Sequence, residues 1–303
     1  MTYIPRNAES RLKYFARGYP VVAVTGPRES GKSTLVRHAF PKHPYVSLEN
    51  LDQTEFAETD SRDFLNQFTE GAILDEAQRC PALFSYLQTR VDERQQPGEF
   101  ILPGSQQFGL LSGITQSLAG RAALLTLLPM AYDELQRAER VGRNLDKILF
   151  DGAYPPIFDR ELEPHPWHGN YVRTYLEHDV RQLINVQDLA TFQRGALFES
   201  WVISELLKAR YNAGETSNLY FWRDRSGNEV DLLIDHGTQL SPPEIKSGQT
   251  INQDYFKGLE FWQKLAGDTA EKAWLVYGGD SRQIRSDVTV LPWHEINSEQ
   301  VVI

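Results

Sequence analysis

The stretch Gly26-Pro27-Arg28-Glu29-Ser30-Gly31-Lys32-Ser33 decides the fold expected for the first half of this 303-residue chain. It matches the phosphate-binding pattern G-x-x-x-x-G-K-[ST] at every fixed position. The apolar, β-branched run Val21–Thr25 precedes it and predicts a buried strand. Residues 34–40 follow it and predict a helix that ends before Pro41. A strand, a Gly-rich loop and a helix in this order predict a site for nucleotide phosphates.

The residue types of this loop suit phosphate for local physical reasons. Gly26 and Gly31 let the backbone approach phosphate oxygens without a Cβ in the way, and the N-terminus of the next helix offers unpaired N–H groups. We expect Lys32 to lie along the β- and γ-phosphates and the Ser33 hydroxyl to be a ligand of Mg²⁺. The loop residues predicted to bind ATP and its Mg²⁺ are Gly26, Pro27, Arg28, Glu29, Ser30, Gly31, Lys32, Ser33 and Thr34.

An acidic pair ends a second apolar run about 45 residues further along the chain. Residues 71–78 read Gly-Ala-Ile-Leu-Asp-Glu-Ala-Gln, which predicts a strand with Asp75 and Glu76 at its tip. Adjacent side chains on a strand point in different directions. Asp75 is therefore predicted to hold Mg²⁺, mostly through its water shell, and Glu76 to act as the general base for the attacking water.

Two further polar positions are candidates for the same site. The run Phe100–Leu102 predicts another core strand, and Gln106 beyond its end is a candidate for the γ-phosphate or the water, as is Ser105. An ordinary turn explains either residue equally well. Arg121 precedes a Leu-rich strand and is a candidate for neutralising the γ-phosphate, in its own subunit or a neighbouring one. A solvated surface arginine is the alternative.

Composition restricts the class of protein. Hydrophobic residues make up 41% and charged residues 24% of the chain, as in globular proteins. The net charge of −10 disfavours a general polyanion binder. Cys80 is the single cysteine, which excludes an internal disulfide framework. No apolar run approaches the roughly 18 residues of a membrane span, and residues 1–6 lack a signal core. We therefore expect a cytoplasmic protein without a membrane partner.

Several motifs of the first half recur together in one known family. They are Gly-Pro-Arg before Gly-Lys-Ser, Ile-Leu-Asp-Glu-Ala-Gln, Phe-Ile-Leu-x-Gly-Ser-Gln, Ser-Leu-Ala-Gly-Arg and a Leu-rich strand ending in Pro. In this combination the chain resembles AAA-type bacterial and archaeal P-loop ATPases that carry a C-terminal domain of unknown function. The resemblance covers nearly the whole chain. It implies an α/β fold: an AAA+-like parallel-sheet domain over residues 1–135, a helical connector over 136–195 and a C-terminal α/β domain over 196–303.

The chain departs from this family pattern at two places. Pro103 stands where many members have Thr. Relatives also place a winged-helix-like block after a segment similar to residues 188–194, whereas here residues 195–199 of the closing domain follow at once. We therefore expect that block to be absent.

The C-terminal part contains a second group of charged residues. Residues 195–211 predict a helix in which Glu205 falls on the apolar face, where a carboxylate needs a partner. Residues 219–224 and 229–235 predict a hairpin, and 243–246 a third strand of the same small sheet. Helix acid, strand Asp and Glu-x-Lys resemble the restriction-endonuclease-like PD-(D/E)xK arrangement. Its tentative second metal site comprises Glu205, Asp231, Glu244 and Lys246; a surface charge pair is the alternative for Glu-x-Lys.

The sequence thus predicts Mg²⁺-dependent ATP binding and hydrolysis coupled to an endonuclease-like domain that acts on or regulates a macromolecular partner. Two alternatives remain: an ATP-dependent protein-interaction switch with little catalysis, and an ATP-coupled, metal-dependent DNA nuclease. Residues 196–303 carry 10 Lys and Arg against 16 Asp and Glu, a net charge of −6, which is unfavourable for a long duplex. Whether the partner is protein or nucleic acid, and the oligomeric state, stay open.

Overall fold

The chain forms two compact units in the computed structural model, which describes residues 3–105, 108–176, 194–223, 229–267, 273–285 and 288–296. The first unit comprises Met1–Met130 with the short stretches Tyr154–Pro156 and Tyr211–Glu215. The second comprises Ala131–Ala153, Ile157–Arg210 and Thr216–Ile303. The domain boundaries expected at residues 135 and 195 stay predictions.

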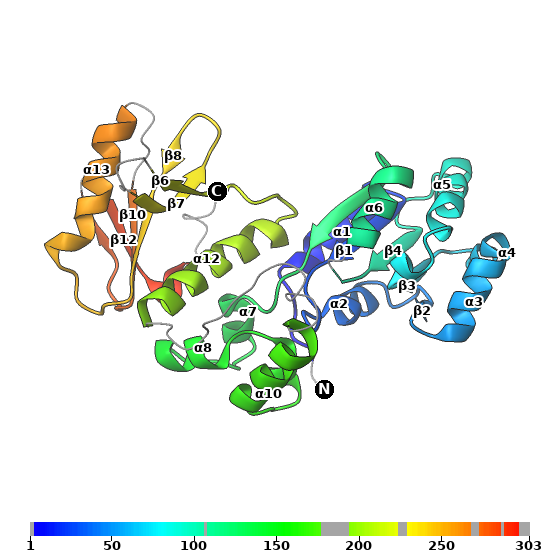
Figure 1. The fold of residues 1–303 in the computed structure, drawn as a ribbon, viewed down its shortest axis with the longest axis horizontal. Coiled ribbons are helices and arrows are strands. Elements are labelled where there is room, and N and C mark those ends of the chain that lie inside the picture. Colours follow the sequence, from blue (N-terminus) through cyan, green and yellow to red (C-terminus); the bar gives the residue numbers. More distant parts are fainter. Residues whose placement is uncertain are drawn as a thin grey trace. The chain divides into compact units, whose positions relative to one another are not determined.

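A five-stranded sheet forms the centre of the first unit (Figure 1). Its spatial order is β2-β3-β4-β1-β5, and all neighbouring strands are parallel. The carboxyl ends of the strands therefore share one edge, and the loops after β1, β3 and β4 meet there. The strands are β1 Val21–Thr25, β2 Tyr45–Ser47, β3 Ala72–Asp75, β4 Phe100–Pro103 and β5 Ala122–Thr126.

Helices cover both faces of this sheet. On one face, α1 (Ala8–Gly18) and α2 (Lys32–Ala39) pack against the apolar residues of β1 that include Val22 and Val24. The alternate residues Val21 and Ala23 belong to the core on the other face. That face is covered by α3 Leu51–Thr59, α4 Ser61–Asn66, the 3₁₀ turn Ala77–Arg79, α5 Leu83–Arg94 and α6 Phe108–Ser117. Burial on two faces explains why β1 is apolar at consecutive positions.

The spacing of apolar residues over residues 52–68 favours a single helix, but the structure has two helices there. The break falls at Asp60, whose side chain accepts a hydrogen bond from the backbone N–H of Asp63. Asp60 thus caps α4 at its start, as a short acidic side chain commonly does. The apolar spacing of this segment gave no sign of the break, because both helices contribute to the same core.

The second unit begins with short helices and continues with a long one. The short helices are α7 Tyr132–Arg137, α8 Leu145–Asp151, α9 Pro155–Asp159, which starts within the first unit, and α10 Pro164–Tyr171, followed by the π-helical turn Val172–Leu176. Apolar residues at helical spacing predict an amphipathic helix over residues 171–183. Its part beyond residue 176 and the segment 188–193 lie outside the described residues. The long helix α12, Arg194–Asn212, agrees with the expected helix over residues 195–211.

The strands of the second unit form two sheets, not the single small sheet expected from the sequence. One is antiparallel, with β6 Leu219–Arg223, β7 Glu229–Asp235 and β8 Leu240–Ser241 in that order. The other has the order β11-β12-β10-β9, in which β11 is antiparallel and the rest are parallel. Its strands are β9 Pro243–Lys246, β10 Ala273–Tyr277, β11 Gln283–Ile284 and β12 Val288–Pro292.

Two helices cover opposite faces of the mixed sheet. On one face, Phe198 and Val202 of α12 pack with Ile245 of β9. On the other face, Leu259 of α13 (Lys257–Ala266) packs with Leu275 of β10. The 3₁₀ turns Gln253–Phe256 and Trp293–Glu295 precede α13 and follow β12. Charged residues of β9 therefore face either α12 or α13, according to their position along the strand.

Candidate functional site

The loop after β1 is held by a close backbone contact at Gly26. This residue has φ +146°, and a Cβ placed on it would lie 2.1 Å from the carbonyl oxygen of Leu127. The backbone N–H of Leu127 in turn donates to the carbonyl of Thr25 at 2.7 Å. Only glycine fits at this position, because any side chain would push the loop away from the chain that leaves β5. The loop is thereby fixed to the centre of the sheet.

Helix α2 begins at Lys32, directly after Gly31 in the left-handed region at φ +91°. No side chain caps this helix, so its first N–H groups face the loop. The Lys32 ammonium donates to the carbonyls of Gly26 at 3.0 Å and Pro27 at 2.8 Å. Burial lowers the pKa of Lys32, and the carboxylates of Glu76 and Asp75 oppose that shift. The loop thus encloses a buried cation beside a helix N-terminus, which suits a phosphate group.

The metal-ligand candidates Ser33 and Asp75 are in contact. The Ser33 hydroxyl donates to Asp75 Oδ2 at 2.7 Å, and the Tyr45 hydroxyl donates to the same oxygen at 2.5 Å. Burial and the hydrogen bond to Asp75 raise the pKa of Tyr45 to about 12. A hydroxyl and a carboxylate side by side are oxygen ligands of the kind Mg²⁺ prefers.

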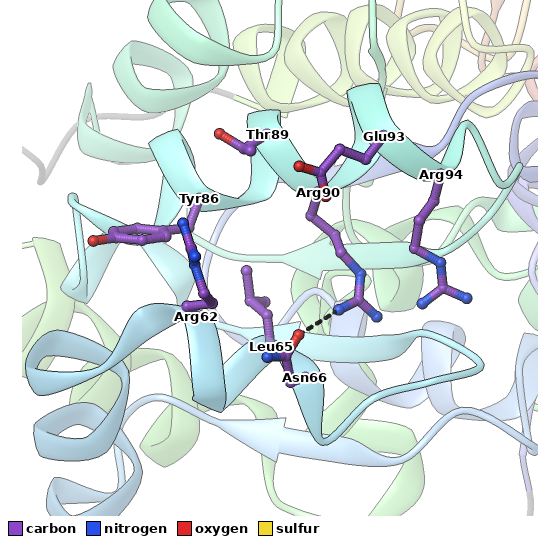
Figure 2. A pocket seen from close by; sticks show the side chains of 8 residues that line it. All are labelled: Arg62, Leu65, Asn66, Tyr86, Thr89, Arg90, Glu93 and Arg94. Atoms are coloured by element: carbon purple, nitrogen blue, oxygen red, sulfur yellow. Dashed lines mark hydrogen bonds between the residues drawn. The ribbon is translucent and has the colours of Figure 1, made fainter.

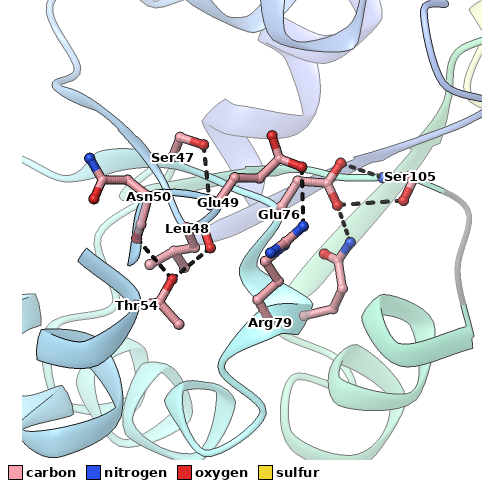
Figure 3. A network of polar contacts seen from close by, with 9 residues as sticks. Ser47, Leu48, Glu49, Asn50, Thr54, Glu76, Arg79 and Ser105 are labelled. Carbon is pink, nitrogen blue, oxygen red and sulfur yellow. Dashed lines mark hydrogen bonds and ion pairs between the residues drawn. The ribbon is translucent and has the colours of Figure 1, made fainter. Parts of the chain in front are cut away.

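Glu76, the candidate general base, has its carboxylate held by the end of β4. Its Oε1 accepts from the backbone N–H of Ser105 at 3.2 Å, and its Oε2 lies 3.4 Å from the Ser105 hydroxyl (Figure 3). Gln78 donates its side-chain amide to Oε2 as well. Glu76 also has φ +56°, a conformation that non-glycine residues rarely adopt. The carboxylate is therefore oriented by three groups while its backbone is in an unfavourable conformation.

Arg6 fixes the loop from outside the motif, and the sequence analysis missed it. Its guanidinium donates to the Ser30 carbonyl at 2.8 Å and to the Leu128 and Pro129 carbonyls at 2.7 and 3.2 Å. It is buried, with 6% of its surface exposed. Three carbonyl contacts from one fork tie the segment before α1 to the loop and to the chain after β5. Nothing in the sequence near Arg6 indicates this contact, because its partners lie 24 or more residues away.

The other residues of the first unit that were predicted to belong to the nucleotide site lie in different places. Pro27, Arg28, Glu29 and Thr34 lie on the loop or the first turn of α2, whereas Gln106 lies outside the described residues. Arg121 precedes β5, and its carbonyl accepts from the N–H of Val21 at the start of β1. It is therefore at the amino edge of the sheet, opposite the loop. There its side chain forms a bidentate pair with Asp92 at 2.5 and 2.8 Å.

A pocket of about 310 Å³ lies between α4 and α5 (Figure 2). Two arginines that line the pocket form ion pairs within the protein. Arg90 pairs with Oε1 of the buried Glu99 at 2.9 Å, and Arg94 pairs with the same oxygen at 3.1 Å. Both also donate to backbone carbonyls, those of Phe68 and Thr69. These bonds connect α5 to the starts of β3 and β4. The pocket is separate from the phosphate-binding loop, which its lining does not include.

The structure places Glu205 apart from Glu244 and Lys246, with which it was predicted to form a second metal site. Glu205 is 1% exposed, pairs with Lys208 at 2.6 Å and accepts from the N–H of Tyr132 at 2.9 Å. It lies on α12, which covers the face of the mixed sheet that carries Ile245. Glu244 and Lys246 lie one residue to either side of Ile245 and so face the opposite way.

On that opposite face, Glu244 and Lys246 contact each other. The two side chains form an ion pair, and a Cβ added to Gly258 of α13 would lie 2.9 Å from Glu244 Oε2. The side chain of Asp231 lies outside what the structure describes. In the described part of the chain, no cluster of three or more His, Cys, Asp or Glu residues is arranged to hold a metal ion. The buried carboxylate of Glu205 is paired with the ammonium group of Lys208.

None of the helices among the described residues is both long enough and apolar enough to cross a membrane. The expected absence of a membrane partner and the cytoplasmic location stay predictions.

Comparisons with known proteins found matches for two parts of this chain. Residues 18–136 match the model of an AAA domain, and residues 194–296 match that of a domain of unknown function, DUF4143. The chain therefore carries an AAA-type P-loop domain followed by a C-terminal domain of unknown function. An uncharacterised protein of Mycobacterium bovis and one of Mycobacterium tuberculosis are each 32% identical to it over 183 residues. The matches cover 59% of this chain but only 40% of those relatives.

Solved structures resemble the chain more distantly. A Walker-type ATPase of Pyrococcus abyssi is 15% identical, with a TM-score of 0.41, over 60% of this chain and 77% of its own. DnaA of Aquifex aeolicus, bound to AMPPCP, is also 15% identical, with a TM-score of 0.38, over 69% of this chain and 81% of its own.

Proposed function

We propose that the protein is a Mg²⁺-dependent ATPase whose nucleotide site lies at the loop after β1. The contact of Ser33 with Asp75, directly beside the buried Lys32, is the observation that carries the proposal. It joins the phosphate loop to the acidic end of β3, which are the two parts that hold Mg²⁺ in P-loop nucleotide hydrolases. The match of residues 18–136 to an AAA domain supports it independently.

The residues present fit a nucleotide with its metal ion. Gly26 lets the loop lie against the Leu127 carbonyl, where a Cβ would collide, and Ser30 has a fully buried hydroxyl without a hydrogen-bond partner among the described residues. The Ser33 hydroxyl and Asp75 provide oxygen ligands. When bound, Mg²⁺ supplies charge neutralisation on the phosphate oxygens. ATP, not another nucleotide, is part of the proposal and rests on the AAA match.

Each residue then has a defined task. The N-terminus of α2 and the loop N–H groups bind the phosphates, and the Lys32 ammonium exchanges its two carbonyl partners for phosphate oxygens. Glu76 accepts a proton from the attacking water, as its place at the end of β3 beside Asp75 allows. Ser105 and Gln78 orient its carboxylate before substrate binds. Arg121 could serve only a neighbouring copy, because within its own copy it lies at the opposite edge of the sheet.

Two variants test this function. Lys32→Ala removes the buried cation, so we expect nucleotide binding, measured by calorimetry with Mg-ATP, to be lost. Glu76→Gln keeps the size and one hydrogen-bond acceptor of the side chain but not its basicity. We expect it to bind Mg-ATP normally and to lose hydrolysis by about 100-fold or more. Wild-type turnover in Lys32→Ala would exclude the site, and wild-type turnover in Glu76→Gln would exclude Glu76 as the base.

An ATP-dependent interaction switch is the alternative within the same site. Glu76 is engaged by Ser105 and Gln78, an arrangement that also suits slow hydrolysis and long-lived binding of ATP. Single-turnover and steady-state assays with Mg-ATP separate the two. Tight binding with negligible turnover would favour a switch whose output is a contact made by the second unit.

Metal-dependent DNA cleavage is the activity that an endonuclease-like domain would give to the second unit. Its support is the Glu-x-Lys pair of β9 on one face of the mixed sheet, while Glu205 is engaged on the other. DNA cleavage in Mn²⁺ that is lost in both Asp231→Ala and Glu244→Ala would support a nuclease. Cleavage that survives both changes would exclude this site.

A further inference from the structure

A tyrosine outside the phosphate-binding pattern touches the carboxylate at the end of β3. The Tyr45 hydroxyl donates to Asp75 Oδ2 at 2.5 Å, and the Ser33 hydroxyl donates to the same atom at 2.7 Å. One oxygen of Asp75 therefore accepts two short hydrogen bonds. Such charge-assisted bonds are stronger than neutral ones and fix the plane of the carboxylate. Both of these bonds leave the other oxygen, Oδ1, outside them.

The register of the sheet explains why Tyr45 reaches this carboxylate. β2 and β3 are parallel, with Tyr45 opposite Ile73. Ile73 packs with Leu35 of α2, so this face of the sheet lies under α2. Asp75 is two residues beyond Ile73 and shares that face. Two residues along a strand span about 6.6 Å, which is the reach of a tyrosine side chain from Cα to hydroxyl.

Helix α2 holds the tyrosine ring as well. The guanidinium carbon of Arg37 lies 4.8 Å from the centre of the Tyr45 ring, which is within the range of a cation–π contact. Arg37 and Ser33 are four residues apart on α2 and thus lie on the same face of that helix. Tyr45 is therefore fixed at its ring by Arg37 and at its hydroxyl by Asp75.

We propose that Tyr45 is a positioning residue for the metal-site carboxylate of Asp75. This inference rests on the proposed function, because it presumes a metal ion bound with the nucleotide. Tyr45 acts through Asp75, which its hydroxyl contacts. Its hydroxyl holds Oδ2 in place, so that Oδ1 would be the oxygen available to the ion. The Ser33 hydroxyl donates its hydrogen to Asp75. The lone pairs of the Ser33 oxygen would therefore be available to bind the ion.

The variant Tyr45→Phe removes the one hydroxyl and keeps the ring that packs on Arg37. We expect it to weaken Mn²⁺ binding to the protein–ADP complex about three- to tenfold, since one charge-assisted hydrogen bond is lost. Electron paramagnetic resonance of free Mn²⁺ measures this directly, without turnover. Binding of fluorescently labelled ADP in EDTA is expected to be unchanged, because the phosphate contacts of the loop remain.

Tyr86→Phe is the matched control. Tyr86 belongs to α5 of the same unit, is 42% exposed and lines the pocket between α4 and α5. We expect wild-type Mn²⁺ and ADP binding in this variant. Equal Mn²⁺ binding by Tyr45→Phe and the wild type would overturn the positioning role. Loss of ADP in EDTA would overturn it as well, because it would show a structural role for Tyr45. If the wild-type protein itself binds no nucleotide, the proposed function fails, whatever the variant does.

Discussion

Gly26 and Tyr45 show which residues of the site a sequence can reveal. The residues of the phosphate loop, with Asp75 and Glu76, lie at spacings that a sequence pattern can predict, and the structure brings Ser33 and Asp75 of this set into contact. Arg6 and Tyr45 reach the site through contacts 24 and 30 residues away in the chain. Such contacts depend on strand order and register, which a single sequence does not state.

Gly26→Ala is the test of the loop at this scale. The added methyl group would lie 2.1 Å from Leu127 O, with φ +146° unfavourable for any L-residue. We expect a loss of about 2–4 kcal/mol in the stability of the first unit, because backbone must shift on both sides. Urea unfolding followed by circular dichroism measures the change.

Gly18→Ala is the control for this substitution. Gly18 is the last residue of α1, and no atom lies within 4 Å of a Cβ built on it. We expect a change within about 0.5 kcal/mol of the wild type. Equal stability of the two variants would contradict the close contact at Gly26.

At the scale of elements, helix α12 was correctly expected, but the role of its buried acid was not. The 3.6-residue spacing placed Glu205 on the apolar face, and the structure buries it. Periodicity cannot say what a buried carboxylate meets. Its partner is Lys208, three residues further along the same helix, together with the first N–H of α7. α7 has no side-chain cap of its own at Ala131, so Glu205 contributes to its start.

Glu205→Gln is expected to destabilise the second unit by about 3–5 kcal/mol. The amide leaves the Lys208 ammonium, only 4% exposed, without its opposite charge. Equilibrium unfolding in urea, followed by the fluorescence of the tryptophans of the second unit, is the measurement. Asp254→Asn, which breaks the exposed pair with Lys257, is the control and should leave the transition where it is. A wild-type transition for Glu205→Gln would show that the pair contributes little.

At the scale of the whole molecule, each unit has a hydrophobic core of its own. The sheet of the first unit is buried between helices α1 and α2 and helices α3 to α6. The mixed sheet of the second unit lies between α12 and α13. The fold of the first unit followed from its motifs and apolar runs. The two-sheet arrangement of the second did not, because short strands do not reveal their neighbours.

Separate cores predict two unfolding transitions in calorimetry. Mg-ATP at about 100 times its dissociation constant should add roughly 2.7 kcal/mol to the stability of the first unit only. The same experiment with Lys32→Ala should show no ligand-dependent shift, because its buried ammonium is gone. A single cooperative transition, or an equal shift of both, would show that the two units do not unfold independently.

The position of β1 between β4 and β5 has a consequence for hydrogen exchange. Amides of β1 are bonded within a fully buried central strand, so their exchange requires unfolding of the whole unit. β2 is an edge strand whose residues are all at least partly exposed, and its amides can exchange through local opening. The proposed nucleotide site therefore spans an interior strand of slow exchange and an edge strand of faster exchange. Lys32 follows the loop after β1, whereas Tyr45 belongs to β2. Deuterium uptake by β1 and by β2 should therefore report on these two parts of the site separately.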